Sequence, residues 1–273
     1  MKRLVYSELL LLIIALFLIA LFTRCEDVIT VDLENAEPQI VIEGTITDAP
    51  GPYTVKITKT TDFYQPSVYE KVSNAVVIIK DSYGNIDSLQ ENEPGVYYTS
   101  IITSSYNETY FLEVIAEGQE YSASTELRTP MILDSISLEQ NYDEESRDNI
   151  RINVYSQDNP GIKDYQRFRI AINGEFENEY SLYDDRLTDG NYIENSINVD
   201  KEDVAPGDTL TVVMSTIDEA AYRYYSTLQE VIGTDGGFSV FSSSPSNPET
   251  NLTNEALGFF GAYAISSKTL IVK

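Results

Sequence analysis

The chain has 273 residues, and 42% of them are hydrophobic, which is enough for packed cores and argues against a disordered protein. Asp and Glu number 44 against 18 Lys and Arg, so the net charge is −26. Such a charge repels a phosphate backbone and argues strongly against DNA or RNA as partners. The length favours two domains.

The residue types that are absent narrow the function further. The chain has no His and a single Cys, which excludes a His-based triad, an internal disulfide and a Cys-rich metal centre. Carboxylates alone can hydrolyse glycosides, but no motif singles out a pair of acids. We therefore expect no enzymatic activity, no cofactor and no metal.

Residues 1–24 are typical of an export signal. Lys2 and Arg3 precede the unbroken apolar run Leu9–Phe22, which is shorter than the roughly 20 residues of a membrane-spanning helix. The run ends just before Cys25, where a lipoprotein signal is cleaved and the Cys is lipidated. Arg24 departs from the small residue expected at this cleavage position. The alternative is an uncleaved signal anchor.

The residues after Cys25 indicate where the protein is delivered. Glu26 and Asp27 resemble the surface-export signal of Bacteroidota lipoproteins, and residues 25–37 have the composition of a tether. We expect a protein that is lipid-anchored in the outer membrane of the cell and faces outward.

Residues 38–128 are dominated by strand patterns. Gln39–Asp48 and Tyr53–Thr60 alternate between apolar and polar residues on either side of a Pro/Gly turn. Ala75–Lys80 is continuously apolar, which predicts a central strand. Tyr110–Ala116 and Glu120–Thr125 predict a hairpin. About seven short strands in this region predict a β-sandwich.

Residues 129–273 continue this pattern with one interruption. Ile217–Ile232 has helical periodicity, with Asp218 as a candidate N-cap and Gly233 as a stop. Strands are predicted at 132–139, 149–157, 165–173, 209–215, 257–265 and 269–272, and long loops at 141–149 and 184–195. The predicted fold is all-β, with two β-sandwich, immunoglobulin-like domains at 38–128 and 129–273, the second carrying helix 217–232.

Acidic residues gather in two predicted loops. Oxygen-rich loops can bind calcium, but neither loop has the EF-hand spacing. A frame that starts at Asp185 places Leu187 at the third position and Ser196 at the last. In so acidic a chain, we interpret both as solvated loops. The clusters are Asp143, Glu144, Glu145 and Asp148, and then Asp184, Asp185 and Asp189.

Aromatic residues near the helix are candidates for an interface. Tyr222 and Tyr225 lie on the predicted helix, and Phe238 and Phe241 lie in the Gly/Ser-rich loop that follows. Tyrosine supplies amphipathic contact area at little entropic cost, which suits binding surfaces. Ordinary packing within a sandwich is the alternative.

Several short sequence segments together resemble one known family. No single segment is specific, but their order along the chain is. They are Cys25–Val28, Ile40–Asp48, Gly51–Ile57, Pro94–Tyr97, Pro206–Leu210, Tyr222–Leu228, Asn251–Thr253 and Ala256–Phe260. In this order they resemble domain-of-unknown-function family 4249 of Bacteroidota outer-membrane lipoproteins. The resemblance implies an outer-membrane lipoprotein, often encoded beside a TonB-dependent transporter, and carries no catalytic or binding residues.

We therefore expect a surface-exposed, non-enzymatic lipoprotein that serves as accessory or ligand-capture partner of a TonB-dependent transporter. The acidic surface favours neutral or cationic cargo. The main alternative is a structural or adhesive envelope protein without cargo. A hydrolase that uses only carboxylates is the third hypothesis, and it requires a cleft with two carboxyl groups about 5–10 Å apart.

Overall fold

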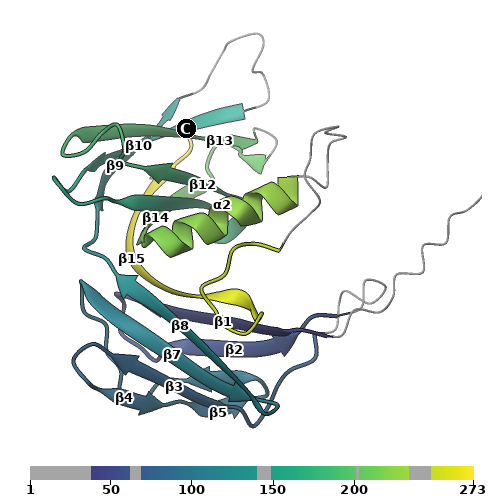
Figure 1. Ribbon diagram of the computed structural model, residues 1–273. Coiled ribbons are helices and arrows are strands. Elements are labelled where there is room, and N and C mark those ends of the chain that lie inside the picture. Colours follow the sequence, from purple (N-terminus) through teal and green to yellow (C-terminus); the bar gives the residue numbers. More distant parts are fainter. Residues whose placement is uncertain (1–37, 62–68, 140–148, 201–202, 234–246) are drawn as a thin grey trace, which may run out of the picture. The chain divides into compact units, whose positions relative to one another are not determined.

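The computed structural model describes residues 38–61, 69–139, 149–200, 203–233 and 247–273 (Figure 1). The predicted signal peptide and tether, most of the predicted loop at 141–149 and most of the predicted Gly/Ser-rich loop after the helix lie outside these residues. Residues 38–273 form one compact unit.

Among the described residues before position 128, eight strands are formed. Their buried side chains alternate with more exposed ones, as in β1 and β7, where every second side chain is buried. The strands are β1 (Ile40–Thr47), β2 (Thr54–Lys59), β3 (Val76–Asp81), β4 (Ile86–Ser88), β5 (Gln90–Glu93), β6 (Val96–Tyr98), β7 (Glu108–Ala116) and β8 (Gln119–Leu127).

Seven strands and one helix follow. The strands are β9 (Ile132–Glu139), β10 (Asn149–Gln157), β11 (Tyr165–Ile172), β12 (Glu175–Asp184), β13 (Tyr192–Asp200), β14 (Thr209–Ile217) and β15 (Leu257–Ile271), and helix α2 (Glu219–Gly233) lies between β14 and β15. The predicted all-β class, with two sandwiches and one helix in the second, is confirmed for the described residues.

Three sheets build the two sandwiches. The largest has eight strands in the order β12-β11-β14-β15-β1-β2-β6-β5, and the others are β4-β3-β7-β8 and β13-β10-β9. One half of the large sheet shares a hydrophobic core with the four-stranded sheet, and the other half shares a core with the three-stranded sheet (Figure 1).

Strand β15 belongs to both sandwiches. Its first half pairs in parallel with β1, from Leu257 opposite Val41 to Tyr263 opposite Thr47. Its second half pairs antiparallel with β14. Phe260, with 0% of its surface exposed, lies in the first core, which therefore includes residues from the end of the chain. The predicted boundary at 128/129 stays a prediction, but the structure shows that residues 40–127 alone do not complete the first core.

Helix α2 is capped by a residue that also contacts the first sandwich. Asp218 Oδ1 accepts the backbone N–H of Ala221 at 2.7 Å, as an N-cap does. Its Oδ2 accepts the Thr125 hydroxyl at 2.9 Å and the Glu126 N–H at 3.2 Å. The helix begins at Glu219 rather than at Ile217, because Ile217 still pairs with Tyr165 as the last residue of β14.

Two local predictions were wrong, and one further strand was not predicted. The two strands expected at 257–265 and 269–272 are one, because pairing with β14 continues through the polar residues Ser266–Lys268. The loop expected at 184–195 ends earlier, because β13 starts at Tyr192. Strand β12 was not predicted, because Asn178 interrupts its apolar face, which carries Phe176, Tyr180 and Leu182.

Candidate functional site

Several predicted site residues lie outside the described residues. These are the lipidation residue Cys25, the export-signal residues Glu26 and Asp27, and the aromatic residues Phe238 and Phe241. Their predicted roles stay predictions. Among the described residues, no helix has the length and apolarity that crossing a membrane requires.

Tyr222 and Tyr225 lie on α2 and pack largely against the sheet beneath the helix. The Tyr222 ring lies 4.8 Å from that of Tyr165, and the Tyr225 hydroxyl is 3.1 Å from that of Tyr263. Tyr180 on β12 donates its hydroxyl to the Tyr225 carbonyl at 2.8 Å. Burial raises the pKa of Tyr180 to about 12, so this hydroxyl keeps its proton at neutral pH.

The guanidinium of Arg167 lies beneath the same helix. Its central carbon is 4.2 Å from the centroid of the Tyr225 ring and 5.2 Å from that of Tyr263. Both distances fit cation–π contacts. These contacts attach the helix to the sheet. Both predicted tyrosines are half-buried by such packing, and their role as an interface stays a prediction.

A groove of about 280 Å³ lies on the open side of the second sandwich, between strands β12 and β13. Its floor is apolar and consists of core side chains, among them Phe168 and Ile170 of β11 and Ile197 and Val199 of β13. Strand β12 ends the large sheet and β13 ends the three-stranded sheet. Neither strand has a further strand beside it among the described residues, although the Tyr183 hydroxyl donates to the Ser196 carbonyl and Gln229 Nε2 to the Tyr180 carbonyl, each at 2.6 Å.

Carboxylates surround this apolar floor. Glu177 and Glu179 come from β12, and Asp200 and Asp203 come from the end of β13 and the turn after it. None of the described residues that line the groove is basic; Lys201 lies outside the described residues. The groove thus combines an apolar floor with an acidic rim. The sequence analysis singled out none of these four acids. The only sign of them in the sequence is that acidic residues lie within or next to strand-forming segments.

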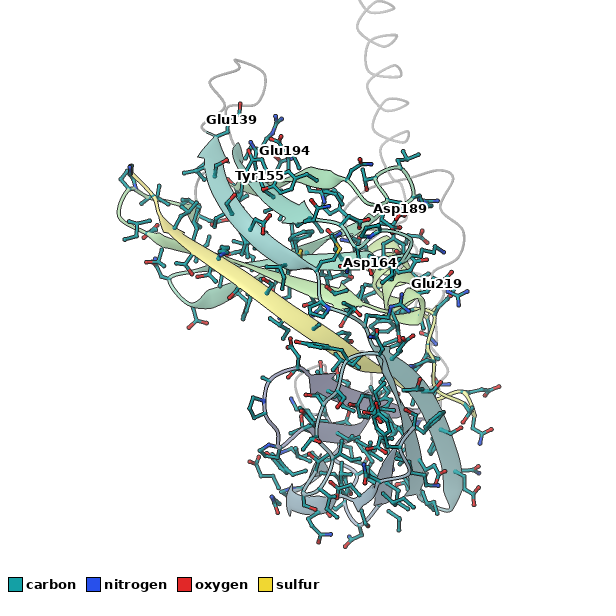
Figure 2. The ribbon with its side chains drawn as sticks, turned by 90° about the vertical axis from the view of Figure 1, so that its left-hand side faces the viewer. Glu139, Tyr155, Asp164, Asp189, Glu194 and Glu219 are labelled. Atoms are coloured by element: carbon teal, nitrogen blue, oxygen red, sulfur yellow. The ribbon has the colours of Figure 1, made fainter. Side chains whose placement is uncertain are left out.

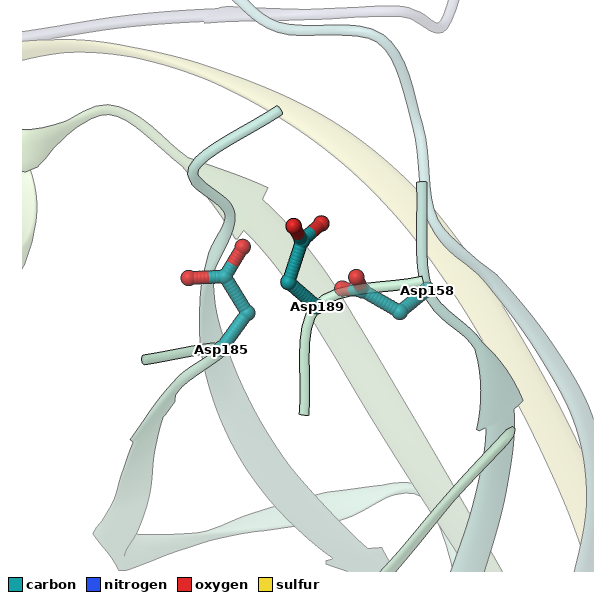
Figure 3. A group of neighbouring side chains, drawn as sticks. All are labelled: Asp158, Asp185 and Asp189. Carbon is teal, nitrogen blue, oxygen red and sulfur yellow. The ribbon is translucent and has the colours of Figure 1, made fainter. Parts of the chain in front are cut away.

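A second acidic group lies where two loops meet. The β10–β11 loop contributes Asp158, and the β12–β13 loop contributes Asp185 and Asp189. One carboxylate oxygen from each residue lies within 4.8 Å of the others. Figure 3 shows the three carboxylates side by side. The acidic loop at 184–189 was recognised in the sequence, whereas Asp158 was interpreted only as part of a turn.

Neighbouring hydrogen bonds hold these carboxylates in place. Asp158 Oδ2 accepts the N–H of Gly190 at 2.7 Å, and Asp189 Oδ1 accepts that of Gly161 at 2.7 Å. Asp185 Oδ2 accepts the N–H of Asp164 at 2.9 Å. Each loop therefore donates to a carboxylate of the other, and the two loops form one unit.

The group is buried as well as acidic. Asp158 and Asp164 are each 1% exposed, and Asp185 is 3% exposed. Burial raises the pKa of Asp158; the N–H of Gly190 opposes the shift and the charges of Asp185 and Asp189 add to it. Burial also raises the pKa of Asp164, to about 6. Burying several carboxylates next to one another therefore raises the free energy of their ionised forms.

These observations define an all-β protein of two joined sandwiches with an acid-lined groove on the second. Residues 26–269 match the family described as "Domain of unknown function (DUF4249)". The chain belongs to this family, as its sequence pattern predicted.

Two other comparisons add little. No curated protein matches the sequence. Among solved structures, the two fibronectin type III domain segment of chicken tenascin is similar, with 11% sequence identity, and the match covers 66% of this chain and 90% of that one. The TM-score is 0.21, so this likeness carries no argument about function.

Proposed function

We propose that this is a lipid-anchored protein of the outer cell surface that binds a basic, extended polypeptide segment in the groove between β12 and β13, without catalysing a reaction. In this proposal it acts as accessory or ligand-capture partner of a TonB-dependent transporter. The observation that carries it is the apolar floor enclosed by four carboxylates between two edge strands.

Charge and backbone geometry both favour such a ligand. An extended peptide can pair its backbone with an exposed strand edge and place alternate side chains in the groove. Apolar side chains would contact the floor, while Lys or Arg side chains would meet Glu177, Glu179 and Asp203. The net charge of −26 attracts the same basic segments at longer range.

The N-terminal sequence supports the anchored location. Cys25 directly follows the signal-like segment, and the match to the family begins at residue 26, the position after it. A lipid at Cys25, together with the tether at 26–37, would confine the protein to the membrane plane. Its effective concentration at a barrel in the same membrane would rise accordingly.

Capture from native membranes tests the partner. The tagged full chain is purified from detergent-solubilised envelopes, and co-purifying proteins are quantified by mass spectrometry. We expect one TonB-dependent barrel at a stoichiometric level. Recovery of the protein alone would contradict the transporter role and favour the structural or adhesive alternative.

Peptide binding tests the groove. Glu177→Gln together with Glu179→Gln removes two rim charges, and should weaken binding of basic, apolar-alternating peptides about tenfold and reduce the salt dependence. Fluorescence anisotropy measures both quantities. The matched control is Glu120→Gln with Glu230→Gln, which removes two exposed charges elsewhere and should leave affinity nearly unchanged. Equal losses in both pairs, or tighter binding of acidic peptides, would contradict the proposal.

A further inference from the structure

The loops that contain Asp158 and Asp185 connect the two sheets of the second sandwich. The β10–β11 loop leaves the three-stranded sheet and enters the large one, and the β12–β13 loop runs in the opposite direction. They meet at one end of the sandwich, where Gln157 pairs with Tyr192 and Tyr165 with Asp184. Figure 2 shows Asp164 and Asp189, one from each loop, on the same side of the molecule.

Oxygen atoms at this junction lie at distances that suit a shared cation. Calcium binds oxygen ligands at about 2.3–2.6 Å, so two ligands of one ion are at most about 5 Å apart. The carboxylate oxygens of Asp158, Asp185 and Asp189 all lie within 4.8 Å of one another. The side chains therefore need little movement to share one ion.

Buried oxygens without a partner give the second, independent indication of a ligand. Asp158 Oδ1 has no hydrogen-bond partner although the residue is 1% exposed. Thr188 Oγ1, between Asp185 and Asp189 in the chain, is also buried and unpartnered, as is Oδ1 of Asp164. A buried polar atom without a protein partner is costly, and three at one junction indicate that a ligand binds there.

Within the part of the chain that the structure describes, no Lys or Arg forms an ion pair with Asp158, Asp185 or Asp189. Arg128 acts electrostatically on Asp164, but its guanidinium donates to Glu126 and to the Lys163 carbonyl. Buried carboxylates are normally paired or bound to a metal.

The ligand chemistry selects the kind of ion. The chain has no His, and the atoms at the junction are carboxylate and hydroxyl oxygens, which suit calcium, magnesium or manganese rather than zinc or copper. Several carboxylates in an irregular arrangement favour calcium, whereas magnesium dehydrates reluctantly and requires near-ideal octahedral geometry.

We infer that the β10–β11 and β12–β13 loops form a calcium site whose ligands are Asp158, Asp185 and Asp189, with Thr188 and Asp164 in support. The bound ion neutralises the buried carboxylates and connects the two sheets at this end of the sandwich. The site is separate from the groove and does not depend on the function proposed above.

Calcium binding to the full chain tests this inference. The protein is purified in detergent, stripped with a chelator and titrated with CaCl₂ in a calorimeter. We expect one ion per chain, with a dissociation constant in the range of extracellular calcium modules, about 10⁻⁴–10⁻³ M. At about ten times that concentration, the melting temperature should rise by about 3–6 °C. MgCl₂ at the same concentration should have a much smaller effect.

Two variants distinguish binding from general screening of charge. Asp158→Asn removes one buried charge, so it should abolish the calcium response and raise the melting temperature of the calcium-free protein. Asp189→Asn, at an exposed position, keeps an oxygen that accepts the Gly161 N–H and should weaken calcium binding at least tenfold with the fold intact.

The matched control is Asp134→Asn, an exposed acid on β9, which should bind calcium as the unaltered chain does. Three results would overturn the inference: no calcium-dependent heat or shift, equal responses to calcium and magnesium, or an unchanged calcium response in both junction variants.

Discussion

The carboxylate of Asp87 on β4 connects a strand to the loop that follows β6. It is 0% exposed and accepts the backbone N–H groups of Ser100 and Ile101 at 2.6 Å each, and that of Ile102 at 3.0 Å. Burial by itself raises the pKa of Asp87, but these donors outweigh burial and hold the pKa below its usual value. The ionised form therefore stabilises the folded state.

Asp87→Asn should lower the free energy of unfolding by about 2–3 kcal/mol at neutral pH, because the charge-assisted hydrogen bonds are lost. A carboxyl whose pKa is lowered in the folded state contributes stability above its unfolded pKa of about 3.9, and this contribution disappears as pH falls through the folded pKa. Urea unfolding between pH 7 and pH 3 measures both effects.

The unaltered protein should lose this part of its stability at acidic pH, so the gap between the two proteins should narrow as pH falls. Asp134→Asn removes an exposed carboxyl and should change stability little. A gap between Asp87→Asn and the unaltered protein that stays constant with pH would show that the charge of Asp87 is not what stabilises this loop.

Among the elements, the junction of β15 with β1 depends on a residue without a side chain. Gly258 has a φ of 92°, and a Cβ there would collide with the backbone carbonyl of Ile42. Only glycine combines this conformation with so close an approach of two strands. This explains why the parallel pairing can begin at Leu257.

Gly258→Ala should destabilise the protein by about 3 kcal/mol or more, because backbone strain adds to the collision. Gly84→Ala is the matched control, since Gly84 has a φ of 95° but a Cβ there would meet nothing within 4 Å. That change should cost only about 1–2 kcal/mol. Thermal unfolding of both variants measures the difference. Equal losses of stability would mean that the collision with Ile42 does not add to the cost of Gly258→Ala.

Sequence patterns predicted elements well where one face is buried. Alternating Ile and Val residues indicated β1 and β2, and periodicity together with Asp218 indicated α2. Strands β12 and β13 border the groove, and a polar residue interrupts the apolar face of each, Asn178 in β12 and Asn195 in β13, so their pattern is weaker.

The two acid-rich sites were harder to predict for a different reason. Asp158 and Asp185 belong to separate loops, and only the pairing of β10 with β13 and of β11 with β12 brings them together. The groove likewise requires two sheets to be placed before its four acids become neighbours. Composition showed that acids were abundant but not which of them meet.

At the scale of the whole molecule, the two cores share one strand. The first core contains Phe260, Ala262 and Ala264 from β15, while the second contains Val272 beyond its end. Asp218 adds a polar link between α2 and β8. Neither sandwich is complete without residues near the end of the chain.

A chain that ends at residue 250 should therefore fail to form a stable first sandwich, although it retains residues 40–127. We expect no cooperative urea transition by circular dichroism and rapid proteolysis throughout. A chain that lacks only the exposed Lys273 should unfold as the full chain does. A cooperative transition in the shorter chain would show that β1–β8 fold without β15.

The parallel pairing of β1 with β15 also determines when the first sandwich can fold. Asp48, at the end of β1, accepts the backbone N–H of Ile265, 217 residues later. Contacts of such long sequence separation form slowly, and this one must wait until the ribosome has released nearly the whole chain. The core of the first sandwich therefore cannot be completed before β15 has been synthesised.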